Sequence, residues 1–183
     1  TYTIAFICIV YGIVGLIWHE LKHKESISLI KDFDWHTFFF LIGIFILVGS
    51  FTYAGVINDI ANFIIGFTKG NKFLAYTIIV WLSVFLSAFI DNIPYIVAMI
   101  PVAKLVALSL GASPELFLFG LLIGTSLGGN ITPIGASANM VAVGLLRKNK
   151  YQVKFSDFFK IGFPFTIAAV SVAYLFLWLV WGK

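Results

Sequence analysis

The chain has 183 residues, of which 61% are hydrophobic, 17% aromatic and only 11% charged, against roughly 25% charged residues in an ordinary soluble domain. A water-soluble fold of this length has too little interior to bury so many apolar side chains, whereas a lipid bilayer removes that requirement. The single cysteine, Cys8, excludes a disulfide framework within the chain. We therefore predict an all-α integral membrane protein that crosses the bilayer several times.

The N-terminal third carries two apolar segments of membrane-spanning length, residues 2–18 and 35–54. Because a helix rises 1.5 Å per residue, about 20 residues cross the roughly 30 Å hydrocarbon core. The first segment has no positive flank or cleavage pattern, so we read it as a helix and not as a signal peptide. Asp34 is a good N-cap for the second. Residues 55–72 place apolar and polar residues on opposite helix faces, which predicts a helix lying in the membrane interface.

Residues 73–108 form an apolar run that is interrupted by Asp91-Asn92-Ile93-Pro94. The arm after the interruption, from Tyr95 to Leu108, would reach only about 21 Å as a helix, which is short of a full crossing. We therefore predict a re-entrant hairpin over residues 73–108, with the polar segment at its tip.

Residues 116–147 are also interrupted, here by the polar and glycine-rich stretch 128–139. One continuous helix would be about 48 Å long, which is too long for a single span. We therefore predict a helix broken near the middle of the membrane. A last span, residues 158–181, ends with Trp178 and Trp181 as interfacial anchors.

The positive charge is concentrated on one side of this arrangement. The segments 19–34 and 147–160 together hold eight Lys or Arg residues, against Lys69, Lys72 and Lys183 on the other side. The positive-inside rule then makes the loops 19–34 and 147–157 cytoplasmic, in a plasma (inner) membrane, with the hairpin opening outward. Because the charge has a membrane explanation, we predict no nucleic-acid binding.

The hairpin tip contains the most informative residue, Asp91. A carboxyl group within apolar membrane sequence costs several kcal/mol unless it faces protein, water or a cation. Ser87 lies one turn earlier, and Pro94 lacks an N–H and so frees a backbone carbonyl. We predict that the tip binds a cation or a proton through Ser87, Asp91, Asn92 and Pro94. The alternative is a plain turn that reaches the headgroups.

The broken helix offers the second candidate site. Discontinuous membrane helices place their ends at a substrate site near the midplane, with N-terminal ends toward anions and carbonyl ends toward cations. We therefore predict a substrate pocket lined by Thr125, Gly128, Gly129, Asn130, Thr132, Gly135, Ser137 and Asn139. The alternative is a packing kink, since Gly120, Gly124 and Gly128 form a small-xxx-small ladder.

These two tracts, with Met99-Ile-Pro101 between them and Phe158-Phe-Lys-Ile-Gly-Phe-Pro164 after them, resemble the ArsB/NhaD group of the ion transporter superfamily, whose members carry citrate-transporter-like domains. The group includes arsenite pumps, sodium/proton antiporters, the melanosomal P protein and, more distantly, dicarboxylate/sodium symporters. The resemblance extends from about Asp34 to the C-terminus. It implies an inverted-repeat transporter in which the hairpin tip and the broken helix form half of the substrate site. Asp91 sets this tip apart from that of the arsenite pumps.

Such transporters contain two repeats of opposite orientation, and only the second, C-terminal repeat is recognisable here. We therefore expect a single membrane domain over residues 1–183 that pairs with a first-repeat partner or with a missing N-terminal half, and that is able to oligomerise. The predicted function is secondary active transport of a small ion coupled to Na⁺ or H⁺, with no other cofactor and no enzymatic activity. An arsenite or carboxylate permease and a non-transporting subunit stay open as alternatives.

A third alternative comes from His19-Glu20-Leu21-Lys22-His23, which spells the H-E-x-x-H motif of zinc proteases. In that motif the two histidines hold Zn²⁺ and the glutamate activates water. The motif would make the chain an intramembrane metalloprotease, with His19, Glu20 and His23 at its metal site. It lies in a charged segment next to a span, however, where such a pattern arises readily by chance.

Overall fold

The computed structural model describes residues 2–23 and 33–182. It contains helices and no strand within these residues, so the prediction of an all-α membrane protein is confirmed. The chain divides into two compact units, Thr1–Ile42 and Gly43–Lys183. Both interrupted apolar regions lie in the second unit.

The first unit contains helix α1 (Tyr2–His23) and the beginning of α3 (Trp35–Tyr53). Helix α1 continues five residues beyond its expected end at Trp18, because glutamate, leucine and lysine all favour helix. The predicted N-cap of α3 is confirmed. The Asp34 carboxylate accepts hydrogen bonds from the backbone N–H and the hydroxyl of Thr37, at 3.0 and 2.5 Å.

Helix α4 (Val56–Phe67) follows α3 at an angle of 67°. The bend occurs at Gly55, whose φ of +80° suits glycine because it has no Cβ to clash. One face of α4 is buried through Ile57, Ala61 and Ile64. By length and hydropathy, α3 and α4 together are a candidate broken span or re-entrant segment, which is a second interpretation beside the interfacial helix expected over residues 55–72.

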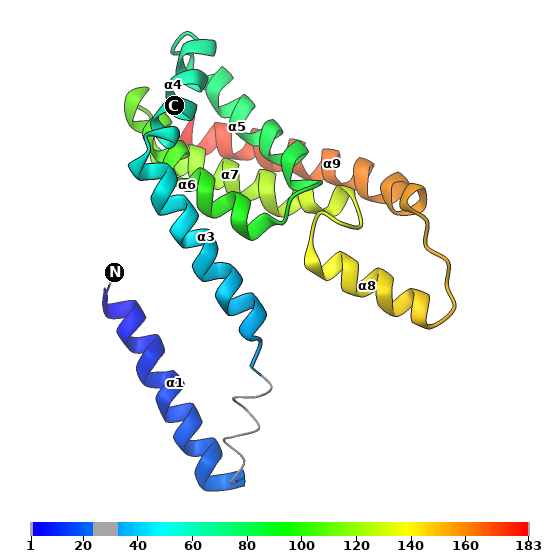
Figure 1. Cartoon of the computed structure of the whole chain (residues 1–183). Helices are drawn as coiled ribbons and strands as arrows, with labels where there is room; N and C mark the ends of the chain where they lie inside the picture. The colour runs from blue at the N-terminus through cyan, green and yellow to red at the C-terminus, as the bar shows by residue number, and fades with distance from the viewer. Residues whose placement is uncertain (1, 24–32, 183) are drawn as a thin grey trace. The chain divides into compact units, whose positions relative to one another are not determined.

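The remaining helices form the body of the second unit. Four of them, α5, α6, α7 and α9, lie side by side, whereas α8 runs apart from this bundle and is joined to it at the helix break (Figure 1). Helix α7 is central, since it contacts α5, α6 and α9. The bounds are Lys72–Ser87 for α5, Asn92–Ser109 for α6, Pro114–Gly128 for α7, Ser137–Lys148 for α8 and Phe155–Trp181 for α9.

The second arm of the predicted hairpin 73–108 is longer than expected. Helix α6 begins at Asn92 and not at Tyr95, and its 18 residues reach about 27 Å, long enough to be a candidate span. The prediction that the arm after the interruption is too short for a full crossing is therefore wrong. Pro94 lies in the first turn of α6, where a missing N–H is tolerated because first-turn N–H groups have no helical partner.

The segment 116–147 is broken, and the break starts at the adjacent pair Gly128 and Gly129. Helix α7 ends at Gly128, a 3₁₀ turn covers Gly129–Ile131, and α8 starts at Ser137. Between them Thr132 is extended, and Pro133 and Ile134 form a tight turn that returns to Gly135. Both helices therefore present an end to the same short stretch of irregular backbone.

The glycine ladder sets the distance between α7 and α5. A Cβ added at Gly124 would lie 2.6 Å from the Val80 carbonyl oxygen, and one at Gly128 would lie 2.6 Å from the Val84 carbonyl oxygen. The two backbones therefore touch, as small residues in a ladder allow. The close approach brings the break, at the C-terminal end of α7, against the tip at the C-terminal end of α5.

Candidate ion site at the helix break

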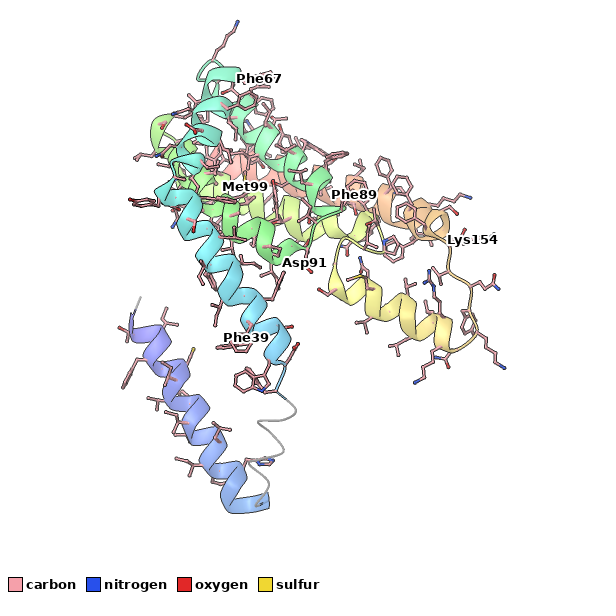
Figure 2. All side chains as sticks on the ribbon, in the orientation of Figure 1. Phe39, Phe67, Phe89, Asp91, Met99 and Lys154 are labelled. Carbon is pink, nitrogen blue, oxygen red and sulfur yellow. The ribbon has the colours of Figure 1, made fainter. Side chains whose placement is uncertain are left out.

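Asp91 joins the hairpin tip to the broken helix. Its Oδ1 accepts a hydrogen bond from the Ile93 N–H at 3.0 Å and so caps α6. Its Oδ2 accepts a hydrogen bond from the Ser137 hydroxyl, the first residue of α8, at 2.8 Å. Figure 2 shows Asp91 at the tip, between the start of α6 and the broken helix. The carboxylate therefore lies at the N-terminal ends of two helices, where the backbone N–H groups favour negative charge.

Ser87 and Asn92 connect the tip to α7. The buried Ser87 hydroxyl donates to the Thr125 carbonyl oxygen at 2.6 Å. Because a hydroxyl has one hydrogen, the contact between Ser87 and Asn92 must be donated by the Asn92 amide. In that orientation the amide nitrogen lies 3.1 Å from the Thr125 carbonyl oxygen and 3.3 Å from that of Gly135. Asn92 thus links α5, α7 and the break.

Thr132 and Gly135 bring the irregular backbone against the end of α5. The buried Thr132 hydroxyl donates to the Ala88 carbonyl oxygen and accepts from the Gly135 N–H at 3.0 Å. A Cβ at Gly135 would lie 2.6 Å from the Gly129 carbonyl oxygen and 2.9 Å from those of Ser87 and Ala88. Only glycine fits there without a shift, and three carbonyl oxygens converge on it.

Asn139 holds the irregular backbone from the side of α8. Its amide nitrogen donates to the carbonyl oxygens of Gly129 and Thr132, at 2.9 and 3.1 Å. A carbonyl that has left a helix must find another donor in an apolar environment. Asn139 provides one to each of these two oxygens.

Two residues of the predicted substrate pocket face elsewhere. The Thr125 hydroxyl donates a hydrogen bond to the Leu121 carbonyl of its own helix. Thr125 therefore contacts the tip through its backbone carbonyl. Asn130 lines a cavity of about 320 Å³ together with Phe158, Ile161, Gly162 and Phe165 of α9. The structure thus gathers Ser87, Asp91, Asn92, Gly129, Thr132, Gly135, Ser137 and Asn139, with Gly128 packed on α5 and Pro94 in the first turn of α6.

Helix α9 supports the break through two residues that the sequence analysis did not select. A Cβ at Gly162 would lie 2.2 Å from the Asn130 carbonyl oxygen. The buried Thr166 hydroxyl donates to the Leu127 carbonyl at 3.2 Å. A glycine and a threonine flanking Pro164 in an apolar span were the available signal, because small and hydroxyl residues mark membrane helix contacts.

The arrangement offers oxygen ligands of the kind that hard cations prefer. They are the Asp91 carboxylate, the Ser87 and Ser137 hydroxyls, and the backbone carbonyls that converge on Gly135. Each carboxylate oxygen retains lone pairs beyond the one hydrogen bond that it accepts. The cluster therefore has the chemistry to bind a small cation or a proton.

The metalloprotease hypothesis lies largely outside the described residues, since the side chains of Glu20 and His23 are not among them. Within the part of the chain that is described, no three His, Cys, Asp or Glu residues form a group suited to a metal ion. The metal site at this motif stays a prediction from the sequence.

Several known proteins are similar in sequence to this chain along most of its length. An uncharacterized transporter of Mycobacterium tuberculosis is 38% identical over 161 residues, which are 87% of this chain and 37% of the relative. An uncharacterized transporter of Synechocystis is 30% identical, covering 90% of this chain and 40% of the relative. The P protein of Sus scrofa is 34% identical over 180 residues, covering 91% of this chain and 21% of that protein.

The chain thus spans well under half the length of these relatives. No solved structure is a significant match to it. Residues 2–183 match the citrate transporter family, CitMHS, which confirms the resemblance to citrate-transporter-like domains. The match covers almost the whole chain, including both interrupted segments. The chain therefore belongs to the citrate transporter family.

Proposed function

We propose that this chain forms one half of the pathway of a secondary active transporter, in which the hairpin tip and the broken helix together bind a small ion. The observation that carries the proposal is the 2.8 Å hydrogen bond from Ser137 to Asp91. It joins two interruptions that are 46 residues apart in the chain, at the kind of paired helix ends that transporters use for binding.

In this proposal Asp91 binds the coupling ion, Na⁺ or H⁺. Ser87 and Asn92 position the tip against α7. The backbone carbonyls that converge on Gly135, those of Ser87, Ala88 and Gly129, supply further oxygen ligands. A cation bound to the Asp91 carboxylate neutralises the negative charge that strengthens the hydrogen bond from the Ser137 hydroxyl. Ion binding would therefore weaken the link between α8 and the tip, which is a direct route from ion occupancy to a change in the broken helix.

The substrate is proposed to bind along the break, and a carboxylate anion is the favoured class. Helix α8 presents its N-terminal end to the cluster, and the N–H groups of a helix N-terminus suit an anion. The family to which the chain belongs is described as citrate transporters. A coupling cation at Asp91 would also neutralise repulsion between that carboxylate and an anionic substrate.

The chain needs a second half in this proposal, because an inverted-repeat site is completed by a repeat of opposite orientation. That half would come from the rest of the same protein or from a partner subunit, in a plasma membrane with loops 19–34 and 147–157 cytoplasmic. The intact protein is therefore the proper object for any transport measurement.

The test is Asp91→Asn in the intact protein, reconstituted in proteoliposomes. The substitution keeps the size of the side chain and removes its charge. Because a hydrogen bond or ligand contact to a charged group is worth about 1.5–3 kcal/mol, we expect the apparent affinity for the coupling ion to fall about tenfold to hundredfold. The measurement is uptake of radiolabelled carboxylate as a function of Na⁺ concentration and of pH, which also separates the two coupling ions.

The matched control is Asp59→Asn, which removes an exposed carboxylate from the first turn of α4. We expect its ion dependence to equal that of the wild type. If Asp91→Asn retains the wild-type ion dependence, or if Asp59→Asn loses as much, Asp91 is not the ion ligand and the proposal is wrong.

A further inference from the structure

A cavity that is lined by none of the residues of the proposed ion site lies along α8. Met140, Val143, Gly144 and Arg147 recur at helical spacing and line it along one face of α8. The cavity has a volume of about 380 Å³, within the usual range of ligand cavities. Its other walls come from the break and from the segment that enters α9, namely Pro133, Ile134, Val153, Lys154 and Phe155. Apart from Arg147 and Lys154, the lining is apolar.

A second cavity adjoins the first and is basic. It measures about 460 Å³ and is lined by Arg147, Lys150, Tyr151, Gln152, Val153 and Lys154. Arg147, Val153 and Lys154 line both cavities. Neither cavity has an acidic residue among its described lining residues. Asp157 of α9 accepts a hydrogen bond from the backbone N–H of Lys154, and it offsets only one of the three positive charges.

We propose that the two cavities together form a binding site for an anionic phospholipid. The phosphate would lie among Arg147, Lys150 and Lys154, and an acyl chain would fill the apolar cavity beside α8. A guanidinium binds phosphate through two parallel hydrogen bonds, and basic residues next to a membrane helix attract anionic headgroups. The adjoining apolar volume favours a lipid over a free anion, because a free anion would leave it empty.

This site shares no residue with the proposed ion site. It nevertheless touches the same broken helix, through Pro133 and Ile134 on one wall and α8 on the other. A bound lipid would therefore hold α8 against the segment entering α9 and favour one position of the broken helix.

The headgroup is tested by titrating the intact protein in detergent with phosphatidylglycerol or with phosphatidylcholine of the same acyl chains, followed by native mass spectrometry. We expect preferential binding of phosphatidylglycerol. Because each basic residue near an anionic headgroup contributes about fivefold, the double substitution Arg147→Gln with Lys154→Gln should weaken that binding about thirtyfold.

The matched control is Lys148→Gln. It lies in the same last turn of α8 but lines neither cavity, so its effect should stay below about fivefold. Equal affinity of the double variant and the wild type would overturn the proposal. So would an equal loss in Lys148→Gln, which would indicate general charge attraction without a site.

The acyl chain is tested with Gly144→Leu, which fills the apolar cavity. A Cβ at Gly144 meets no atom within 4 Å, so the helix tolerates the change, and a thermal melt of the variant verifies the fold. The control is Ala142→Leu, an exposed position on α8 outside the cavity. We expect phosphatidylglycerol binding to fall about tenfold or more in Gly144→Leu only. Unchanged binding, or displacement of the lipid by millimolar inorganic phosphate with Gly144→Leu unaffected, would indicate an anion site and overturn the lipid proposal.

Discussion

The polar side chains of the break first of all satisfy the backbone. The segment 129–136 between α7 and α8 is not α-helical, so its carbonyl groups lack α-helical partners, and each would cost several kcal/mol if left unsatisfied in an apolar environment. Asn139 supplies donors to the carbonyls of Gly129 and Thr132, and Thr132 in turn donates to the Ala88 carbonyl at the end of α5. An ion at this site would meet carbonyls that are already oriented, so little reorganisation would accompany binding.

Gly135 is the residue at which this arrangement is most sensitive. We expect Gly135→Ala to destabilise the protein by about 1–3 kcal/mol and to abolish ion-coupled uptake, because its Cβ would lie within 2.9 Å of three backbone carbonyl oxygens. The measurement is the melting temperature in detergent together with uptake in proteoliposomes. Gly144→Ala is the control, since its Cβ meets no atom within 4 Å. Equal melting temperatures for the two variants would contradict the close packing at Gly135.

At the scale of the elements, α7 is the central helix of the bundle, since α5, α6 and α9 all pack against it. It contacts α5 through the glycine ladder and α9 through Thr166. Helices α5 and α9 also contact each other directly: the rings of Tyr76 and Tyr174 stack at 4.9 Å, and the Tyr76 hydroxyl donates to the Tyr174 carbonyl. The end of α7 that carries the break is therefore held on two sides, whereas α8 beyond it is not.

The ladder predicts a graded response to alanine. A Cβ at Gly124 or Gly128 would meet backbone atoms of α5, which cannot move alone, whereas at Gly120 it would meet the Tyr76 and Val80 side chains. We expect Gly124→Ala and Gly128→Ala each to cost about 1–3 kcal/mol and Gly120→Ala to cost less. Melting temperatures of the three variants in one detergent measure this order, and a larger loss at Gly120 would refute the backbone contact.

At the scale of the whole molecule, the charge distribution and the helix lengths constrain how the chain lies in the bilayer. Helix α9 is about 40 Å long, which exceeds the roughly 30 Å hydrocarbon core. Its first two turns, with Asp157 and Lys160, can therefore extend into the headgroups. The basic loop between α8 and α9 then lies at a membrane surface, and the positive-inside rule predicts that this surface is the cytoplasmic one.

The topology leads to a labelling experiment. In intact protein whose native cysteines, including Cys8, are replaced by serine, we expect Lys148→Cys to react with a membrane-impermeant maleimide from the cytoplasmic face only. Lys69→Cys should react from the outer face only. Inside-out and right-side-out vesicles provide the two faces. Reaction of both cysteines from one face would refute the predicted orientation.

The sequence by itself determined the class of the protein and the positions of its two interruptions. Hydropathy decides whether a segment enters the bilayer, and glycine and proline interrupt a helix where they occur, so both are local properties. The capping role of Asp34 and the existence of the glycine ladder were predictable on the same grounds. The sequence pattern predicts too short an α6, because a proline after polar residues indicates an interruption, whereas Pro94 lies in the first turn of the helix.

Only the tertiary structure decided which groups meet. It paired Asp91 with Ser137 and Asn139 with the carbonyls of Gly129 and Thr132, and it turned Asn130 toward α9. It also placed Gly162 and Thr166 against the break. These contacts join residues far apart in the chain, and they depend on how closely the helices pack and how they are rotated. No local pattern carries that information, because the same spacing of polar residues is compatible with several neighbours.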